Sequence, residues 1–174
     1  MLNLKKIIYL SLFIAMEVIF TRFFSINTPI VRIGFGFLPI AIASMMFGPL
    51  YGGIMAGAAD VLGMMLFPTG GTFFPGFTMS ACLTGVIYGV FLYQKPKTWR
   101  RIIMAVLTLT IVVTLGLNSL WLSILTGNGL WAILPTRIFK ALIMIPIQIL
   151  VIHQIWTHLA SYAEKMFFNK HRNA

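Results

Sequence analysis

Long apolar stretches are the feature of this chain that most restricts its fold. Short turns rich in Gly, Pro or charged residues separate them. The stretches cover residues 7–24, 34–49, 51–67, 74–93, 102–126 and 134–161. Because one helix that crosses a bilayer needs about 20 mainly apolar residues, the pattern predicts an all-α, polytopic membrane protein with six transmembrane helices.

The composition leaves no room for a large domain outside the membrane. Charged residues make up 9% of the 174 residues, whereas a soluble domain carries about a quarter. Six spans of about 20 residues would also use most of the chain. We therefore expect residues 1–174 to form a single integral membrane domain.

Positive charges predict the orientation of this domain, because Lys and Arg residues in short loops are retained on the cytoplasmic side. With six crossings, one side receives Lys5, Lys6, Lys95, Lys97, Arg100, Arg101, Lys165, Lys170 and Arg172. Only Arg22, Arg32 and Arg137 fall on the opposite side. Both termini are therefore predicted to be cytoplasmic. Membrane topology also explains the net charge of +10 better than nucleic-acid binding does.

Polar residues inside the predicted spans are candidate functional residues, because an ionisable group in hydrocarbon costs several kcal/mol unless it is paired or hydrated. The candidates in the outer half of the membrane are Asp60, Asn118, Arg137 and Lys140, and Arg32 joins them from the first outer loop. With Glu17 and Arg22 they give this region an excess of positive charge, which suits a dianionic ligand. The competing interpretation is that the carboxylates pair with the cations to hold helices together, and we favour it for Glu17.

Aromatic residues in the predicted outer loops are candidates for stacking on a flat ligand. Phe74 and Phe77 lie in a loop that Pro and Gly keep out of a helix, and Trp121 lies just below the next outer loop. Aromatic residues at a membrane interface also serve as an anchoring belt. A belt does not require a Gly-rich loop, so both interpretations stay open for these three residues.

The chain lacks the residues that several classes of function require. Cys82 is the only cysteine, which excludes an intrachain disulfide and a cysteine metal cluster. The chain contains no G-x-x-x-x-G-K-[ST] segment for ATP, and no histidine in the outer half to activate a nucleophile. We therefore predict no catalytic residue, no metal, no cofactor and no enzymatic activity.

Small residues recur at four-residue spacing, which lets helices approach closely in lipid. They include Gly53, Gly57, Gly85, Gly89, Ser11 and Ala15. The glycines predict a tight pair between the third and fourth spans. Ser11 and Ala15, on the first span, could instead face a partner protein.

Five segments carry a resemblance to a known family. They are R-I-G-F-G-F-L-P (32–39), F-G-P-L-Y-G-G (47–53), D-V-L-G (60–63), F-F-P-G-F-T (73–78) and G-V-I-Y-G (85–89). With these segments the chain resembles the folate-specific, substrate-binding S component of energy-coupling factor (ECF) transporters over nearly its whole length. The first and fourth segments are the most particular to the folate type.

The resemblance implies a six-helix subunit of the bacterial plasma membrane that captures folate at the extracellular face. It would deliver folate after docking on a membrane coupling subunit, the T subunit, which is attached to two ATPases. In this family a small-x-x-x-small motif on the first helix meets the T subunit, and Ser11 and Ala15 occupy that place.

The chemical groups of folate are complementary to the candidate residues. Arg32, Arg137 or Lys140 would bond its two carboxylates, and Phe74, Phe77 or Trp121 would stack on its flat pterin. Asp60 or Asn118 would accept hydrogen bonds from the N–H groups of the pterin edge. Two alternatives are an S component for another small vitamin such as thiamine, and a membrane scaffold without a transport role.

Overall fold

The computed structural model describes residues 4–27, 32–68, 73–96 and 98–167, with the side chains of 26–27, 32–33 and 158–167 left undescribed. Its helices are α1 (Leu4–Arg22), α2 (Phe37–Phe47), α3 (Pro49–Leu66), α4 (Pro75–Leu92), α5 (Trp99–Leu109), the π-helix η1 (Thr110–Leu117), α6 (Asn118–Thr126) and α7 (Leu130–Phe167). Because α5, η1 and α6 are continuous, the described residues form six helical bodies. These bodies coincide with the predicted apolar stretches, so the helical prediction is confirmed.

A short hairpin, which no sequence pattern predicted, joins α1 to α2. Strands β1 (Ser25–Asn27) and β2 (Arg32–Gly34) pair antiparallel, with Ile26 opposite Ile33. The strands lie within a predicted outer loop, where alternation over three residues is too short to be recognised. The hairpin therefore adds a small two-stranded element to an otherwise helical fold.

Four of the helical bodies in the described part of the chain are long and apolar enough to cross a membrane. They are α3, α4, the helix Trp99–Thr126 and the segment Leu130–Thr157 of α7. By contrast, α2 has 11 residues and therefore rises only about 16 Å, roughly half the hydrocarbon thickness. Four charged residues reduce the apolar character of α1: Lys5, Lys6, Glu17 and Arg22. The molecule is thus a helical membrane protein.

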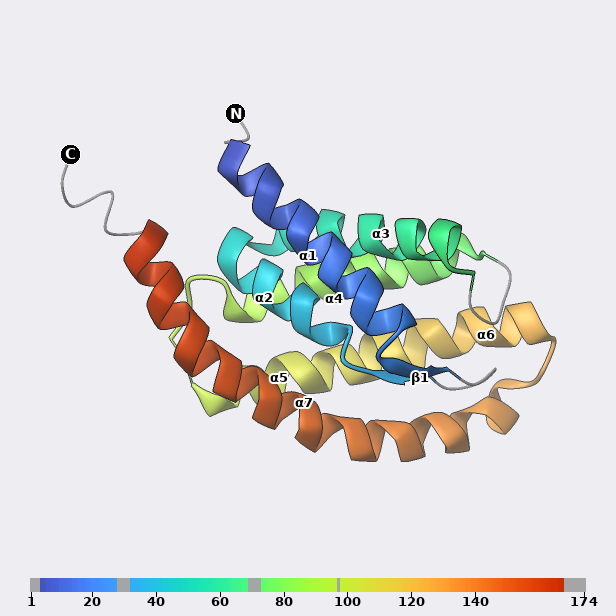
Figure 1. Ribbon diagram of the computed structural model, residues 1–174. Coiled ribbons are helices and arrows are strands. Elements are labelled where there is room, and N and C mark those ends of the chain that lie inside the picture. Colours follow the sequence, from blue (N-terminus) through green and yellow to red (C-terminus); the bar gives the residue numbers. More distant parts are fainter. Residues whose placement is uncertain (1–3, 28–31, 69–72, 97, 168–174) are drawn as a thin grey trace.

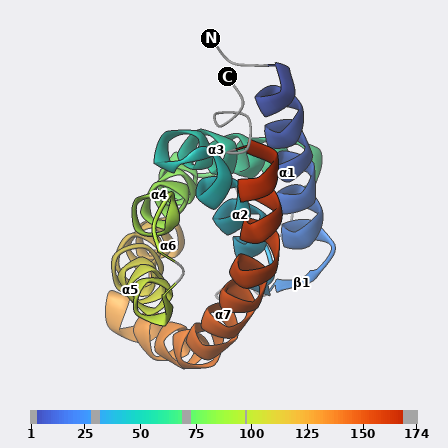
Figure 2. The ribbon, with the colours of Figure 1, turned by 90° about the vertical axis from the view of Figure 1, so that its left-hand side faces the viewer.

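The helices run along a common direction, and the connections gather at the two ends of the bundle (Figure 1). One end holds both termini, the turn between α2 and α3, and the connection between α4 and α5. We call it the terminal end. The opposite end, which we call the hairpin end, holds β1 and β2 and the connection between α6 and α7. Viewed along the bundle, α7 curves from α5 across to α2 (Figure 2), and Pro135 and Pro146 lie inside this helix.

Helices α3 and α4 form the most extensive pair, and glycines explain how closely they approach. A Cβ atom on Gly85 would collide with the backbone of Gly52, and one on Gly89 would collide with the backbone of Pro49. At Gly53 a Cβ would lie 2.9 Å from the side chain of Val86. The tight pair that the glycine spacing predicted is therefore confirmed.

The apolar core fills the half of the bundle nearer the terminal end. Its largest fully buried members include Tyr88 and Leu92 of α4, Met55 of α3, Ile102 of α5 and Ile152 of α7. The core cluster draws on α1 to α5, η1 and α7. Most candidate site residues lie in the other half, where α6, the start of α4 and the start of α7 meet.

Candidate functional site

Three aromatic side chains meet where the start of α4 contacts α6. The ring of Phe74 lies 5.7 Å from that of Trp121 and 6.0 Å from that of Phe77, measured between centroids. Gly76 is buried beneath them, and a Cβ at this position would lie 2.6 Å from the Trp121 ring. Because Pro75 starts α4 directly after Phe74, the Pro-Gly sequence both begins the helix and leaves room for the rings.

Ser80 fixes the orientation of the Trp121 ring. The indole Nε1 donates a hydrogen bond of 3.1 Å to the Ser80 hydroxyl oxygen, and Ser80 is buried. A buried indole N–H needs such a partner. Ser80 was not among the predicted site residues; its place one turn after Gly76 on the same helix was the available signal.

Asp60 of α3 is connected to the aromatic group through Thr78. The Thr78 hydroxyl donates a 2.8 Å hydrogen bond to the Asp60 carboxylate, and Thr78 directly follows Phe77 on α4. Both side chains are partly buried. A carboxylate oxygen is thereby held at the contact between α3 and α4, by the residue that follows Phe77 in the sequence.

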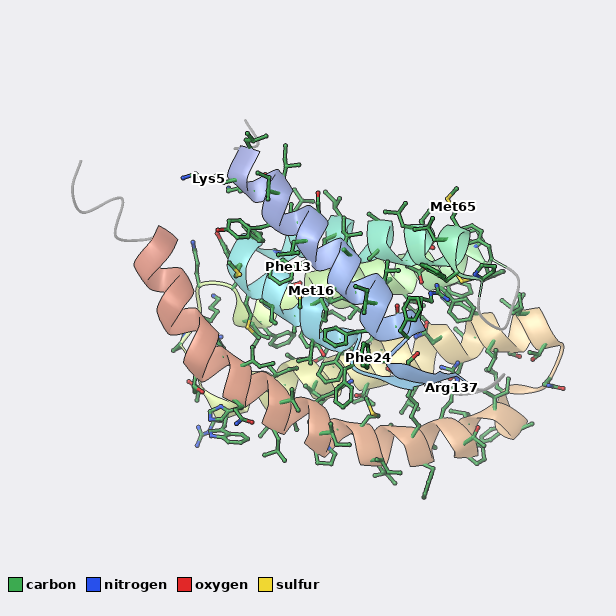
Figure 3. The ribbon with its side chains drawn as sticks, viewed as in Figure 1. Lys5, Phe13, Met16, Phe24, Met65 and Arg137 are labelled. Carbon is green, nitrogen blue, oxygen red and sulfur yellow. The ribbon has the colours of Figure 1, made fainter. Side chains whose placement is uncertain are left out.

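Arg137 reaches from α7 to the π-helical segment η1. Its Nη1 donates a 3.0 Å hydrogen bond to the carbonyl oxygen of Thr114. Its Nε is buried without a hydrogen-bond partner in the described structure, and so is the Oδ1 of Asn118, at the start of α6. Figure 3 shows Arg137 on the side of α7 that faces the rest of the bundle. Two buried polar atoms with unused hydrogen-bonding capacity therefore belong to adjoining elements.

The structure also gives a position for each of the remaining predicted site residues. Arg32 begins β2, so its backbone lies at the hairpin end, while its side chain is outside the described part of the structure. Lys140 is partly buried on α7, one turn after Arg137, and interacts with another group. Ser11 and Ala15 lie apart from the site, exposed on α1.

Two further charged residues of α1 approach the hairpin end, and both are buried. Arg22 packs its guanidinium against Gly63 of α3, where a Cβ would lie 3.1 Å from the Arg22 Nε. Glu17 lies near Gly36, just before α2. This packing between helices accords with the structural role that we favoured for Glu17.

The combined geometry suits a flat ligand with a polar edge and negative charge. The structure brings Phe74, Phe77 and Trp121 together, and α6 carries Asn118 one turn before Trp121, on the same face. Aromatic faces, an amide, a carboxylate and a guanidinium provide stacking, hydrogen-bond acceptors and charged donors. Among the described residues, no three His, Cys, Asp or Glu side chains are grouped so that they could hold a metal ion.

Comparison with known proteins identifies the family. A family model described as "ECF transporter, substrate-specific component" matches residues 5–156. The chain belongs to this family. The resemblance seen in the sequence segments is thereby confirmed, and the ECF substrate-specific components are parts of transporters rather than enzymes.

Two relatives of this ECF component are named as folate transporters. "Folate transporter FolT" of Clostridium novyi (strain NT) is 49% identical over 156 residues, which cover 90% of both chains. "Folate transporter FolT" of Leuconostoc mesenteroides is 29% identical over 154 residues, covering 85% of this chain and 82% of the relative.

Solved structures agree with the family assignment. A structure described as "Crystal structure of FolT bound with folic acid" has a TM-score of 0.84 and 41% identity, and the match covers 88% of this ECF component and 93% of that chain. The S component for biotin from another ECF-type transporter has a TM-score of 0.64 at 19% identity, with 88% and 92% covered. The second likeness shows the shared fold alone.

Proposed function

We propose that this chain is the folate-binding S component of an ECF-type vitamin uptake transporter. The observation that carries the proposal is the meeting of Phe74, Phe77 and Trp121 where α4 contacts α6. Polar groups on the adjoining helices α3 and α7 support it. The 49% identical relative that is named a folate transporter supports the same conclusion. So does the likeness to the structure described as bound with folic acid.

The aromatic group is proposed to hold the pterin ring. Phe74 and Trp121 are tilted by 47° to each other, so they offer two faces to a flat heterocycle. An aromatic contact of this kind contributes about 0.5–1.5 kcal/mol beyond the buried area. Asp60 and Asn118 would supply acceptors for the N–H groups of the pterin edge.

The two carboxylates of the glutamyl tail are proposed to remain near the hairpin end. Burying a carboxylate far from water costs much more than burying a neutral ring. Arg32, at the start of the second strand, is at that end and would form charge-assisted hydrogen bonds with the tail. Lys140 adds positive charge on α7, while the Arg137 guanidinium is directed to η1.

The proposal includes a topology and partners. Residues 1–174 would form one domain of six crossings in the bacterial plasma membrane, with both termini cytoplasmic and the hairpin end outside. Lys5, Lys6 and the α4–α5 connection at the terminal end carry the positive charge that supports this orientation. After capture, the chain would dock on a T subunit attached to two ATPases, and the exposed Ser11 and Ala15 are the proposed contact.

Equilibrium binding of labelled folate to the purified protein in detergent tests the proposal. We expect saturable binding of one folate per chain. Charge reversal by Arg32→Glu or Arg137→Glu is expected to abolish binding without removing cooperative thermal unfolding. Unchanged folate affinity in both variants would exclude these residues from the site.

A thermal-shift panel separates the remaining functions. Folate should raise the melting temperature, whereas thiamine, which is cationic, is disfavoured by a site with excess positive charge. Stabilisation by thiamine but not by folate would show that the chain is an S component for another vitamin. No stabilisation by any small ligand would favour a scaffold without a transport role.

A further inference from the structure

The segment η1 interrupts a long membrane helix with π-helical winding. It covers Thr110–Leu117, in the middle of the 28-residue helix Trp99–Thr126. In a π-helix the backbone N–H bonds to the carbonyl five residues earlier, and such segments are rare and are frequent at functional sites. The carbonyl oxygens of η1 therefore point in other directions than those of a regular α-helix, and different side chains can reach them.

One backbone carbonyl of this segment accepts hydrogen bonds from two side chains. The Thr114 oxygen accepts a 3.0 Å hydrogen bond from Nη1 of Arg137 and a 3.4 Å hydrogen bond from the Ser119 hydroxyl. An arginine side chain has many rotamers, and this contact fixes the position of its head group. Thr114 is therefore a positioning residue for the guanidinium of Arg137.

The fixed guanidinium retains a donor that has no partner in the described structure. Its Nε is buried without a hydrogen-bond partner in the described structure, as is Oδ1 of Asn118. Leaving buried polar groups unsatisfied is costly unless a ligand supplies the missing partner. Such a ligand would present an acceptor to Arg137 and a donor to Asn118.

Depth decides which part of the proposed ligand meets Arg137. Thr114 lies 12 residues before the end of α6 at Thr126, so it is roughly 18 Å below the hairpin end, while Trp121 is roughly 8 Å below it. A neutral pterin can reach that depth at much lower cost than a doubly charged glutamyl tail. The pterin edge, rather than the tail, is therefore expected at Arg137.

We propose that Arg137, positioned by the Thr114 carbonyl of η1, is a specificity-determining residue that recognises the oxygen at position 4 of the pteridine. This inference rests on the proposed folate function. In folate the oxygen at position 4 is an acceptor, and the neighbouring N3–H is a donor. They match the two unpartnered groups, a guanidinium donor of Arg137 and the amide acceptor of Asn118.

The 4-amino analogue of folate reverses both groups. An amino donor replaces the oxygen, and N3 loses its hydrogen and becomes an acceptor. The amide of Asn118 can turn round and offer its NH2 group, but a guanidinium has donors only. Arg137 is therefore the residue that would reject the analogue.

Paired affinities for folate and 4-amino-4-deoxyfolate test the inference. The wild-type protein should bind the analogue at least about tenfold more weakly, because a polar site rejects a ligand that leaves its groups unpaired. Arg137→Gln should reduce this ratio to about threefold or less, since a glutamine amide serves as donor or acceptor. The control Thr136→Val changes the exposed neighbour of Arg137 on α7 and should leave the ratio unchanged.

A deletion in η1 tests the positioning role of Thr114 without altering Arg137. Removing Ile111, which is 63% exposed, should return the segment to α-helical winding and withdraw the Thr114 carbonyl from Arg137. We expect folate still to bind and the ratio to fall at least threefold.

The outcomes separate the two proposals. Equal affinities of the wild-type protein for both ligands, or an unchanged ratio in Arg137→Gln, would overturn the inference on Arg137 while leaving the folate function intact. An unchanged ratio in the deletion variant would overturn the role of Thr114. A wild-type protein that binds neither ligand would overturn the proposed function itself. If a variant fails to fold, the wild-type ratio still tests the inference.

Discussion

Trp121 joins the aromatic and polar parts of the candidate site through one side chain. Its ring packs against Phe74, while its N–H is bound by Ser80. The ring is thus held by α6 and α4 at once. A side chain held in this way loses little further entropy when a ligand stacks on it, so its contribution to affinity should be large.

Substitution of Trp121 tests this argument. Trp121→Ala removes the stacking surface and the hydrogen bond to Ser80, and it should weaken folate binding about tenfold or more, equivalent to roughly 1.4 kcal/mol. Trp121→Phe keeps a ring and should have a smaller effect. Isothermal titration calorimetry with folate measures both.

Trp131 provides the matched control. It is 88% exposed at the start of α7, near the same end of the molecule. Trp131→Ala should leave folate affinity within about twofold, because an exposed side chain of this kind contributes little to a buried site. An equal loss in both alanine variants would point to a general effect of removing indole rings and would contradict the site.

At the scale of single residues, the sequence predicts residue types better than contacts. Phe74 and Phe77 were identified because the neighbouring Pro and Gly predicted a loop, and Trp121 because it lies just below the next outer loop. The structure brings the three rings together, but it places Phe77 in the first turn of α4 rather than in a loop. The partners Ser80 and Thr114 could not be found in this way. The hydrogen bond between Trp121 and Ser80 forms only because α4 and α6 pack together. Thr114 binds Arg137 through its backbone carbonyl, which every residue type possesses.

Among the elements, the α3–α4 pair depends most directly on side-chain size. The backbone of Gly52 lies where a Cβ of Gly85 would be. Gly85→Ala must therefore push the two helices apart, which should cost about 1–3 kcal/mol of stability. We expect a lower melting temperature in detergent, measured by thermal unfolding.

Gly129 is the control for this substitution. No atom lies within 4 Å of the position that its Cβ would occupy, so Gly129→Ala should change the free energy of unfolding by less than about 0.5 kcal/mol. Equal melting temperatures for the two variants would show that the close approach of α3 and α4 does not limit stability.

The outer face of α1 is the second element-scale test. Ser11 and Ala15 are exposed there, whereas Phe13 and Val18 face the core. The double substitution of Ser11 and Ala15 to leucine should block close approach of a partner helix and leave folate affinity within about twofold. Co-purification with the T subunit and the two ATPases measures the first effect.

A control for α1 comes from another lipid-facing position. Val90 of α4 is 55% exposed, and Val90→Leu also enlarges an exposed apolar side chain, by one methylene, away from α1. This variant should co-purify normally with the partner subunits. Normal co-purification of the α1 double variant would remove Ser11 and Ala15 from the proposed interface.

The helices were predictable because their apolar length is written in the sequence, but two local features were not. The hairpin β1–β2 consists of three-residue strands, which are shorter than any reliable alternating pattern. The π-helical winding of η1 has no breaker residue beyond Gly116 to announce it. Neither feature has a local sequence pattern long enough to predict it.

Over the whole molecule, the apolar core and the candidate site lie in opposite halves of the bundle. The core cluster near the terminal end includes Met55, Tyr88 and Leu92, all almost fully buried. The candidate site lies nearer the hairpin end and contains buried polar atoms of Asn118 and Arg137. Substitutions in the site should therefore change binding more than they change folding.

The orientation of the whole molecule gives the last prediction. Thr98, in the α4–α5 connection, and Asn128, in the α6–α7 connection, are exposed and lie at opposite ends of the bundle. Because the terminal end carries Lys5, Lys6 and Arg100, it should face the cytoplasm. In a Cys82→Ala background, a membrane-impermeant maleimide should label Asn128→Cys in intact cells and Thr98→Cys only after the membrane is opened. Labelling of Thr98→Cys in intact cells, with protection of Asn128→Cys, would reverse the orientation and place the candidate site on the cytoplasmic side, where it could not capture a vitamin from outside.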